Sequence, residues 1–111
     1  MPLASVNGIN INYRVAGDGE PLVMIMGFSA GRIGWVPQLR FFKRYYRVVT
    51  FDNRGAGRSD KPPGPYSTGM MADDTAKLMD VLGIEKAHIM GLSMGGMIAQ
   101  ELAINYPQRV M

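Results

Sequence analysis

The stretch Gly91-Leu92-Ser93-Met94-Gly95 decides the fold of this chain. The apolar residues 87–90 before it are typical of a short buried strand, and residues 96–106 after it favour a helix that ends before Pro107. A serine between glycines at such a junction predicts a strained turn that lifts the hydroxyl into solvent. The two glycines are needed because side chains at their positions would collide with the neighbouring strand and helix. We therefore interpret Ser93 as a candidate nucleophile rather than as part of a purely structural turn.

Upstream of this turn, the chain reads as a β-hairpin followed by alternating strands and helices. The dipeptide Asn7-Gly8 supplies the positive φ angles of a tight turn between residues 3–6 and the alternating strand at residues 9–15. Residues 22–26 and 48–51 are apolar on both faces, which is typical of strands that helices cover on both sides of a sheet.

Two further helices are expected between these strands and the serine turn. The second of them should begin after Ser67 or Thr68 and end at Gly83, with Asp73 and Asp74 in its first turn, where the helix dipole favours negative charge. The first should begin near Pro37 and carry an apolar face at helical spacing, made of Trp35, Leu39, Phe42 and Tyr46. This order predicts an α/β fold with an N-terminal β-hairpin, a mostly parallel sheet and flanking helices, all within a single domain over residues 1–111.

Composition excludes several classes of protein. The 111 residues, 47% hydrophobic and 19% charged, fit one folded domain. The absence of cysteine excludes a disulfide scaffold, a thiolate zinc site and a cysteine nucleophile. The densest apolar run, residues 22–26, is far shorter than the ~20 residues that cross a bilayer. The first residues lack the basic and apolar segments of a signal peptide, so we expect a cytoplasmic protein with no membrane partner.

The net charge of +3 does not by itself indicate a nucleic-acid partner. Its excess is concentrated in four residues, which we interpret as a solvated face rather than a phosphate-binding patch: Arg40, Lys43, Arg44 and Arg47. Nucleotide binding is also disfavoured, because no G-x-G-x-x-G follows a strand and no Gly-Lys-Ser/Thr closes a phosphate loop. We expect no nucleic-acid partner.

Three blocks of this sequence together resemble the N-terminal part of the α/β-hydrolase fold family. Residues 91–96 resemble its nucleophile elbow, and residues 52–60, Asp-Asn-Arg-Gly-Ala-Gly-Arg-Ser-Asp, resemble its D-x-R-G-x-G-x-S block after the fourth strand. Met26-Gly27-Phe28 stands at the place of the family's His-Gly-x oxyanion loop after the third strand. The blocks occur in family order, and the resemblance covers nearly the whole chain.

The resemblance implies a site in which Ser93 is the nucleophile. The backbone N–H groups of Met94 and Phe28 match the two donors of the oxyanion hole, and no metal or organic cofactor is implied. Met26 departs from the usual histidine, but some bacterial members that this sequence resembles also have Met-Gly there, so we expect the loop to be preserved. We interpret Asp52, Arg54 and the glycines of their loop as residues that fix a turn and a buried ion pair rather than take part in catalysis.

The only histidine, His88, lies on the strand that leads into the serine turn, up to ~16 Å from Ser93 if that segment is extended. We therefore interpret it as a buried or hydrogen-bonded strand residue and not as the general base. The family order is serine, acid, histidine, which implies that the acid and the base follow Met111. On this interpretation the chain is the front part of a longer hydrolase and is inactive alone. Its last strand would then be an unpaired edge, covered by the rest of the protein or by a second copy.

The function that these observations predict is acyl transfer in a serine hydrolase, with an ester, a lactone or a related small acyl compound as substrate. Serine rather than aspartate at the elbow disfavours the dehalogenase and epoxide-hydrolase branches of the family. Carboxylesterase, enol-lactonase, carbon–carbon bond hydrolase and cofactor-free perhydrolase activities all stay open. The alternative from another class is a non-catalytic α/β-hydrolase-like module that binds a small molecule or a partner through the same cleft.

Overall fold

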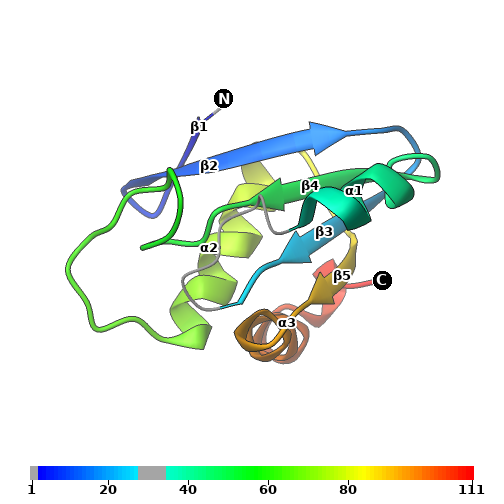
Figure 1. The fold of residues 1–111 in the computed structure, drawn as a ribbon. Helices are drawn as coiled ribbons and strands as arrows, with labels where there is room; N and C mark the ends of the chain where they lie inside the picture. Colours follow the sequence, from blue (N-terminus) through cyan, green and yellow to red (C-terminus); the bar gives the residue numbers. More distant parts are fainter. Residues whose placement is uncertain (1–2, 28–34) are drawn as a thin grey trace.

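A five-stranded sheet forms the centre of the part of the chain that the computed structural model describes, residues 3–27 and 35–111 (Figure 1). Its strand order is β1-β2-β4-β3-β5. The strands are β1 (Leu3–Val6), β2 (Ile9–Ala16), β3 (Glu20–Ile25), β4 (Tyr46–Phe51) and β5 (His88–Gly91). The helices are α1 (Val36–Phe42), α2 (Thr68–Val81) and α3 (Met94–Asn105), followed by a short 3-10 helix (Pro107–Arg109). The predicted α/β fold is confirmed.

The sheet is mixed because the hairpin joins it in the opposite direction to the later strands. β1 pairs antiparallel with β2 through a turn at Asn7 and Gly8, where φ is 49° and 79° as the sequence predicts. β2 then pairs antiparallel with β4, whereas β3 pairs in parallel with both β4 and β5. The described sheet is therefore half parallel rather than mostly parallel. The difference arises because β2, the second strand of the hairpin, lies next to β4 and pairs with it in the antiparallel direction.

Two apolar layers cover the sheet, one on each face, as expected for strands that are apolar on both sides. Val23 and Ile25 of β3 pack with side chains of α2 and α3, whereas Leu22 and Met24 pack with Trp35 and Leu39 beside α1. The alternation along β3 is the two-residue period of a strand. Trp35, which the sequence places on the apolar face of the first expected helix, is a core residue with 4% exposure.

Two details of the expected helices differ from the structure. Tyr46 was expected on the apolar face of the first helix, but it begins β4, because α1 ends at Phe42 and a tight turn follows. α2 begins one residue after Ser67, whose side chain accepts a hydrogen bond from Met70 N as an N-cap. Asp73 is thus the sixth residue of α2, so the prediction that it and Asp74 occupy the first turn is wrong.

The residue immediately before β5 has a partner on the outer edge of the sheet. Val110 forms a parallel bridge with Ala87, in which Ala87 N donates to Arg109 O at 3.0 Å and Met111 N donates to Ala87 O at 2.9 Å. The residues after the 3-10 helix therefore begin to run alongside β5 as a further parallel strand would. The edge that the sequence predicts to be unpaired is covered at this point.

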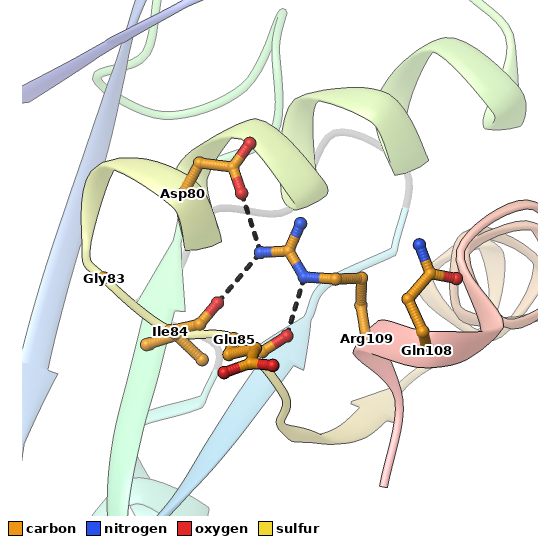
Figure 2. Close-up of a pocket in the computed structure, with 6 residues that line it drawn as sticks. All are labelled: Asp80, Gly83, Ile84, Glu85, Gln108 and Arg109. Carbon is orange, nitrogen blue, oxygen red and sulfur yellow. Dashed lines mark hydrogen bonds and ion pairs between the residues drawn. The ribbon is translucent and has the colours of Figure 1, made fainter.

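Arg109 fixes this segment through its side chain. Figure 2 shows the guanidinium reaching across an open pocket to Asp80 at the end of α2 and to the backbone that follows it. Its Nη2 lies 2.8 Å from an Asp80 carboxylate oxygen and donates to Ile84 O at 2.9 Å, while Nε donates to Glu85 O at 2.7 Å. Because these bonds join the loop before β5 to the residues after α3, they hold Val110 in register with Ala87.

Candidate active site

Ser93 occupies a strained turn between β5 and α3. Its φ and ψ angles are 57° and −119°, a conformation that non-glycine residues rarely adopt and that is usually found at functional sites. The turn is tight because a Cβ on Gly91 would overlap the carbonyl of Gly95, and a Cβ on Gly95 would overlap the oxygen of Ile25. The collisions that the sequence predicts at the two glycines are confirmed.

The start of α3 presents backbone N–H groups beside Ser93. Gly95 N donates to Leu92 O at 2.8 Å, and Gly96 N donates to Ser93 O at 2.8 Å. Met94 precedes both and is the first residue of the helix, so its N–H has no acceptor one helical turn back. This N–H also lies at the positive end of the helix dipole, where developing negative charge is stabilised.

The turn that follows β3 packs directly against Ser93. A Cβ on Gly27 would lie 3.1 Å from Leu92 O, 3.4 Å from Ser93 Cβ and 3.8 Å from Met94 N. Leu92 N also donates to Ile25 O at 3.1 Å, which joins the ends of β3 and β5. Phe28, the second N–H donor implied by the resemblance, lies outside the described residues.

Met26 does not reach toward the serine with its side chain. It is 7% exposed and packs in the same layer as Trp35 and Leu39, on the α1 face of the sheet. Its carbonyl is held instead by a residue that the sequence did not single out: Asn53 Nδ2 donates to Met26 O at 3.0 Å. No local sequence signal predicts this bond, because the two residues are 27 positions apart and meet only through the pairing of β3 with β4.

The loop after β4 is held by Asp52. This carboxylate accepts from Asn12 Nδ2 at 2.8 Å and from Arg58 N at 2.9 Å, and a Cβ on Gly57 would overlap it. Ser59 Oγ in turn donates to Asp52 O and accepts from Asn12 N. Asp52 therefore fixes the turn, as expected from the sequence.

Arg54 forms a buried ion pair, as expected, but the partner that the structure gives it is Asp74 of α2, which the sequence did not predict. Nε and Nη2 of Arg54 donate to the two Asp74 oxygens at 2.6 and 2.8 Å, and the two side chains are 10% and 2% exposed. The hydrogen bond to Asp74 raises the pKa of the Arg54 guanidinium. Asn7 Nδ2 donates to both Asp73 and Asp74, and Tyr106 donates to Asp73. The paired acids of α2 thus connect the hairpin turn, the loop after β4 and the end of α3.

His88 lies at the opposite end of β5 from Ser93. It is the first residue of the strand, and at a rise of ~3.3 Å per residue the four-residue strand alone separates the two by about 10 Å. Its Nε2 is 3.3 Å from Glu20 Oε1, and its ring meets Tyr46 edge-on at 5.6 Å between centroids. The prediction of a hydrogen-bonded strand histidine is confirmed.

The described part of the chain holds neither a metal-binding cluster nor a membrane-spanning helix. Among residues 3–27 and 35–111, no three acidic or histidine side chains are placed to hold a metal ion. The described helices are also too short or too polar for any of them to cross a membrane.

One small cavity, of about 110 Å³, lies beside the serine turn and is lined by Asn53, Arg54, Gly55, Ala56, Tyr66, Met71 and Met94.

A serine on a strained strand-to-helix turn, packed against a glycine that follows the adjacent parallel strand, is an arrangement typical of α/β proteins with a G-x-S-x-G motif. The family model of the alpha/beta hydrolase fold matches residues 20–111. The chain belongs to the α/β-hydrolase fold family.

Relatives of this chain differ in the reactions that their names describe. It is 36% identical over 110 residues to a protein of Azorhizobium caulinodans provisionally named carbamate hydrolase RutD, covering 99% of this chain and 42% of that protein. An enol-lactonase from Burkholderia xenovorans LB400 superposes with a TM-score of 0.95 at 34% identity, covering 98% of this chain and 44% of the lactonase. An N-acyl homoserine lactone degrading enzyme gives a TM-score of 0.94 at 39% identity, with 98% and 42% covered. The chain thus spans less than half the length of each.

Proposed function

We propose that this chain supplies the nucleophile and the oxyanion hole of a serine hydrolase that acts on an ester, a lactone or a related acyl compound. Ser93 Oγ attacks the substrate carbonyl carbon, and the N–H groups of Met94 and Phe28 stabilise the oxyanion that forms. A histidine takes the serine proton and returns it to the leaving alcohol or enol. Water then hydrolyses the acyl-enzyme by the same sequence of proton transfers.

The observation that carries this proposal is the backbone conformation of Ser93. A φ of 57° at a non-glycine residue costs of the order of 1–3 kcal/mol, and a purely structural turn would avoid that cost with a glycine. The strain instead presents a hydroxyl at the N-terminus of α3, next to the unbonded first N–H of the helix. Names of relatives, among them a lactonase and a lactone-degrading enzyme, support an acyl substrate.

The general base and its acid are proposed to come from sequence beyond Met111. His88 is the only imidazole in these 111 residues, and its ring is bonded to Glu20 at the far end of β5. A base must come within hydrogen-bond reach of the serine oxygen, about 2.6–3.2 Å. Relatives more than twice as long as this chain leave ample sequence for an acid and a histidine.

Hydrolysis of p-nitrophenyl acetate and of a simple γ-lactone tests the proposal. In the longer protein that contains residues 1–111, we expect turnover that Ser93→Ala abolishes and that His88→Gln leaves largely intact. The 111-residue chain alone should show no appreciable turnover. Activity of the longer protein that survives Ser93→Ala would refute the nucleophile. Absence of any turnover, with a small molecule still bound in the cleft, would instead favour the non-catalytic binding module.

A further inference from the structure

Asn53 is a buried amide whose role is not explained by the turn in which it lies. The turn is held by its backbone, with Ala56 N donating to Asn53 O at 3.0 Å and Gly55 N donating to Asp60 O at 2.9 Å. The side chain is only 3% exposed. Its Oδ1 has no hydrogen-bond partner among the described residues. An apolar side chain would leave no such acceptor unsatisfied, so stability alone does not account for an amide at this position.

The one bond that the amide makes within the described part of the chain is to the segment beside the serine. Asn53 Nδ2 donates to Met26 O at 3.0 Å, and Met26 O belongs to the same peptide unit as Gly27 N. Fixing that carbonyl fixes the plane of the whole peptide, because the peptide bond is planar. The next residue, Gly27, contacts Leu92, Ser93 and Met94 across the gap between β3 and β5, at the distances given above.

Met26 O is therefore confined from two sides. On one side lies Gly95, where a Cβ would come within 3.0 Å of this oxygen. On the other side lies the Asn53 amide. The glycine limits how closely the peptide can approach the helix, whereas the amide sets the direction of its carbonyl. Only the second contact is a directed hydrogen bond.

We propose that Asn53 is a positioning residue for the serine turn: its amide fixes the Met26–Gly27 peptide, which packs against Leu92, Ser93 and Met94 and so sets the place of the attacking hydroxyl. This inference rests on the proposed function of Ser93. Asn53 acts through the peptide of Met26 and not on the substrate itself. Its loss should therefore reduce the stabilisation of the transition state more than the binding of the substrate.

Asn12 provides a matched control. It is also a buried asparagine, 1% exposed, with one amide bond, to Asp52 Oδ2 at 2.8 Å, and an Oδ1 without a partner among the described residues. Its bond supports the loop after β4 and does not contact the turn beside Ser93. Removing either amide deletes one buried hydrogen bond. The bond of Asn12 is to a carboxylate and is the stronger of the two, so Asn12→Leu should lose at least as much stability as Asn53→Leu. Only the loss of Asn53 should affect the reaction.

The test compares Asn53→Leu with Asn12→Leu in the longer protein, through melting temperature, kcat and KM for ester hydrolysis. We expect Asn53→Leu to lower kcat by about 10- to 100-fold with KM within about 2-fold, because a misplacement of about 1 Å at the reacting groups can cost about 100-fold in rate. Asn12→Leu should leave kcat within about 2-fold. Equal kcat in the two variants would overturn the positioning role.

Asn53→Asp gives a readout that does not depend on the leucine variant folding. A carboxylate cannot donate to Met26 O, whereas the protonated carboxyl can. The kcat of Asn53→Asp, divided by that of the unmodified protein at the same pH, should rise by at least about 5-fold as the pH falls through the titration of the new carboxyl. A ratio that stays constant with pH would contradict the proposal. Turnover that survives Ser93→Ala would refute the proposed function instead, and so the two failures can be distinguished.

Discussion

Gly95 should not tolerate even a methyl group, whereas its neighbour Gly96 should. A Cβ on Gly95 would overlap Ile25 O and lie 2.8 Å from Ile25 C, against ~3.5 Å or more for relaxed carbon contacts. The obstacle is backbone of the adjacent strand, so α3 must move by about 0.7 Å or more relative to β3. A Cβ on Gly96 would meet only Gly91 O, at an ordinary 3.9 Å.

The two substitutions should change the stability of the protein in opposite directions. Forcing an extra carbon into a closely packed region costs about 1–3 kcal/mol, and occasionally more, so Gly95→Ala should destabilise the protein by at least ~2 kcal/mol. Gly96→Ala meets no obstacle and gains helix propensity, which stabilises by up to about 1 kcal/mol. The helix carries the N–H of Met94, so a displacement approaching 1 Å should also lower kcat by about 100-fold in Gly95→Ala.

Urea unfolding of the two variants and of the unmodified protein measures this difference. The midpoint should fall for Gly95→Ala and stay equal or rise for Gly96→Ala, with unchanged dependence on urea concentration. The pair is matched because both changes add the same methyl group to the first turn of the same helix. Equal stabilities for the two variants would refute the claim that the close approach of α3 to β3 requires glycine at position 95.

Three further predictions follow from the contacts described. The hydrogen bond to Asp73 raises the pKa of Tyr106, so its stabilising effect is complete below about pH 10 and is lost as the pH rises through the raised value. In urea unfolding between pH 8 and 11, Tyr106→Phe should therefore lower stability below pH 10 and flatten the decline above it. Asp74→Asn leaves the buried Arg54 without its charge partner and should cost about 3–5 kcal/mol, whereas replacing both by leucine should cost less. In light scattering, the 111-residue chain should self-associate through the edge of β5, and a monodisperse, cooperatively melting monomer would contradict this.

The sequence predicts most of the fold because its local signals agree with one another. Asn7-Gly8 allows one kind of turn, Ser67 caps the helix that follows it, and the residues of β3 are apolar on both faces. The predicted ends of helices and strands are wrong where the same residues are compatible with both kinds of element. Tyr46 continues a helical spacing but is equally suited to the strand in which it lies, and only the end of α1 at Phe42 decides between the two.

The contacts around the serine turn are harder to predict because they join segments distant in the chain. The need for glycine at positions 91 and 95 is predictable, since a side chain at either place in a G-x-S-x-G turn would overlap backbone of the neighbouring helix or strand. The bond from Asn53 to Met26 is not, because an asparagine in a glycine-rich loop is ordinarily a turn residue. The pairing of Arg54 with Asp74 cannot be predicted from the local sequence either. The two residues are 20 positions apart, and Asp74 lies on a helix whose first turn the sequence places incorrectly.

The strand order explains why these residues meet at all. β3 lies between β4 and β5, and all three run in parallel, so their carboxyl ends open at the same edge of the sheet. The residues that follow the three ends are the Met26–Gly27 turn in the centre, Asn53 on the β4 side and Ser93 on the β5 side. A turn in the middle position is necessarily touched by both neighbours. On the β5 side it must approach the serine closely, which requires small residues at Gly27 and Gly95. On the β4 side no backbone has to approach this closely, so a longer side chain has room to bond to the Met26 carbonyl and fix its direction. Asn53 occupies that position.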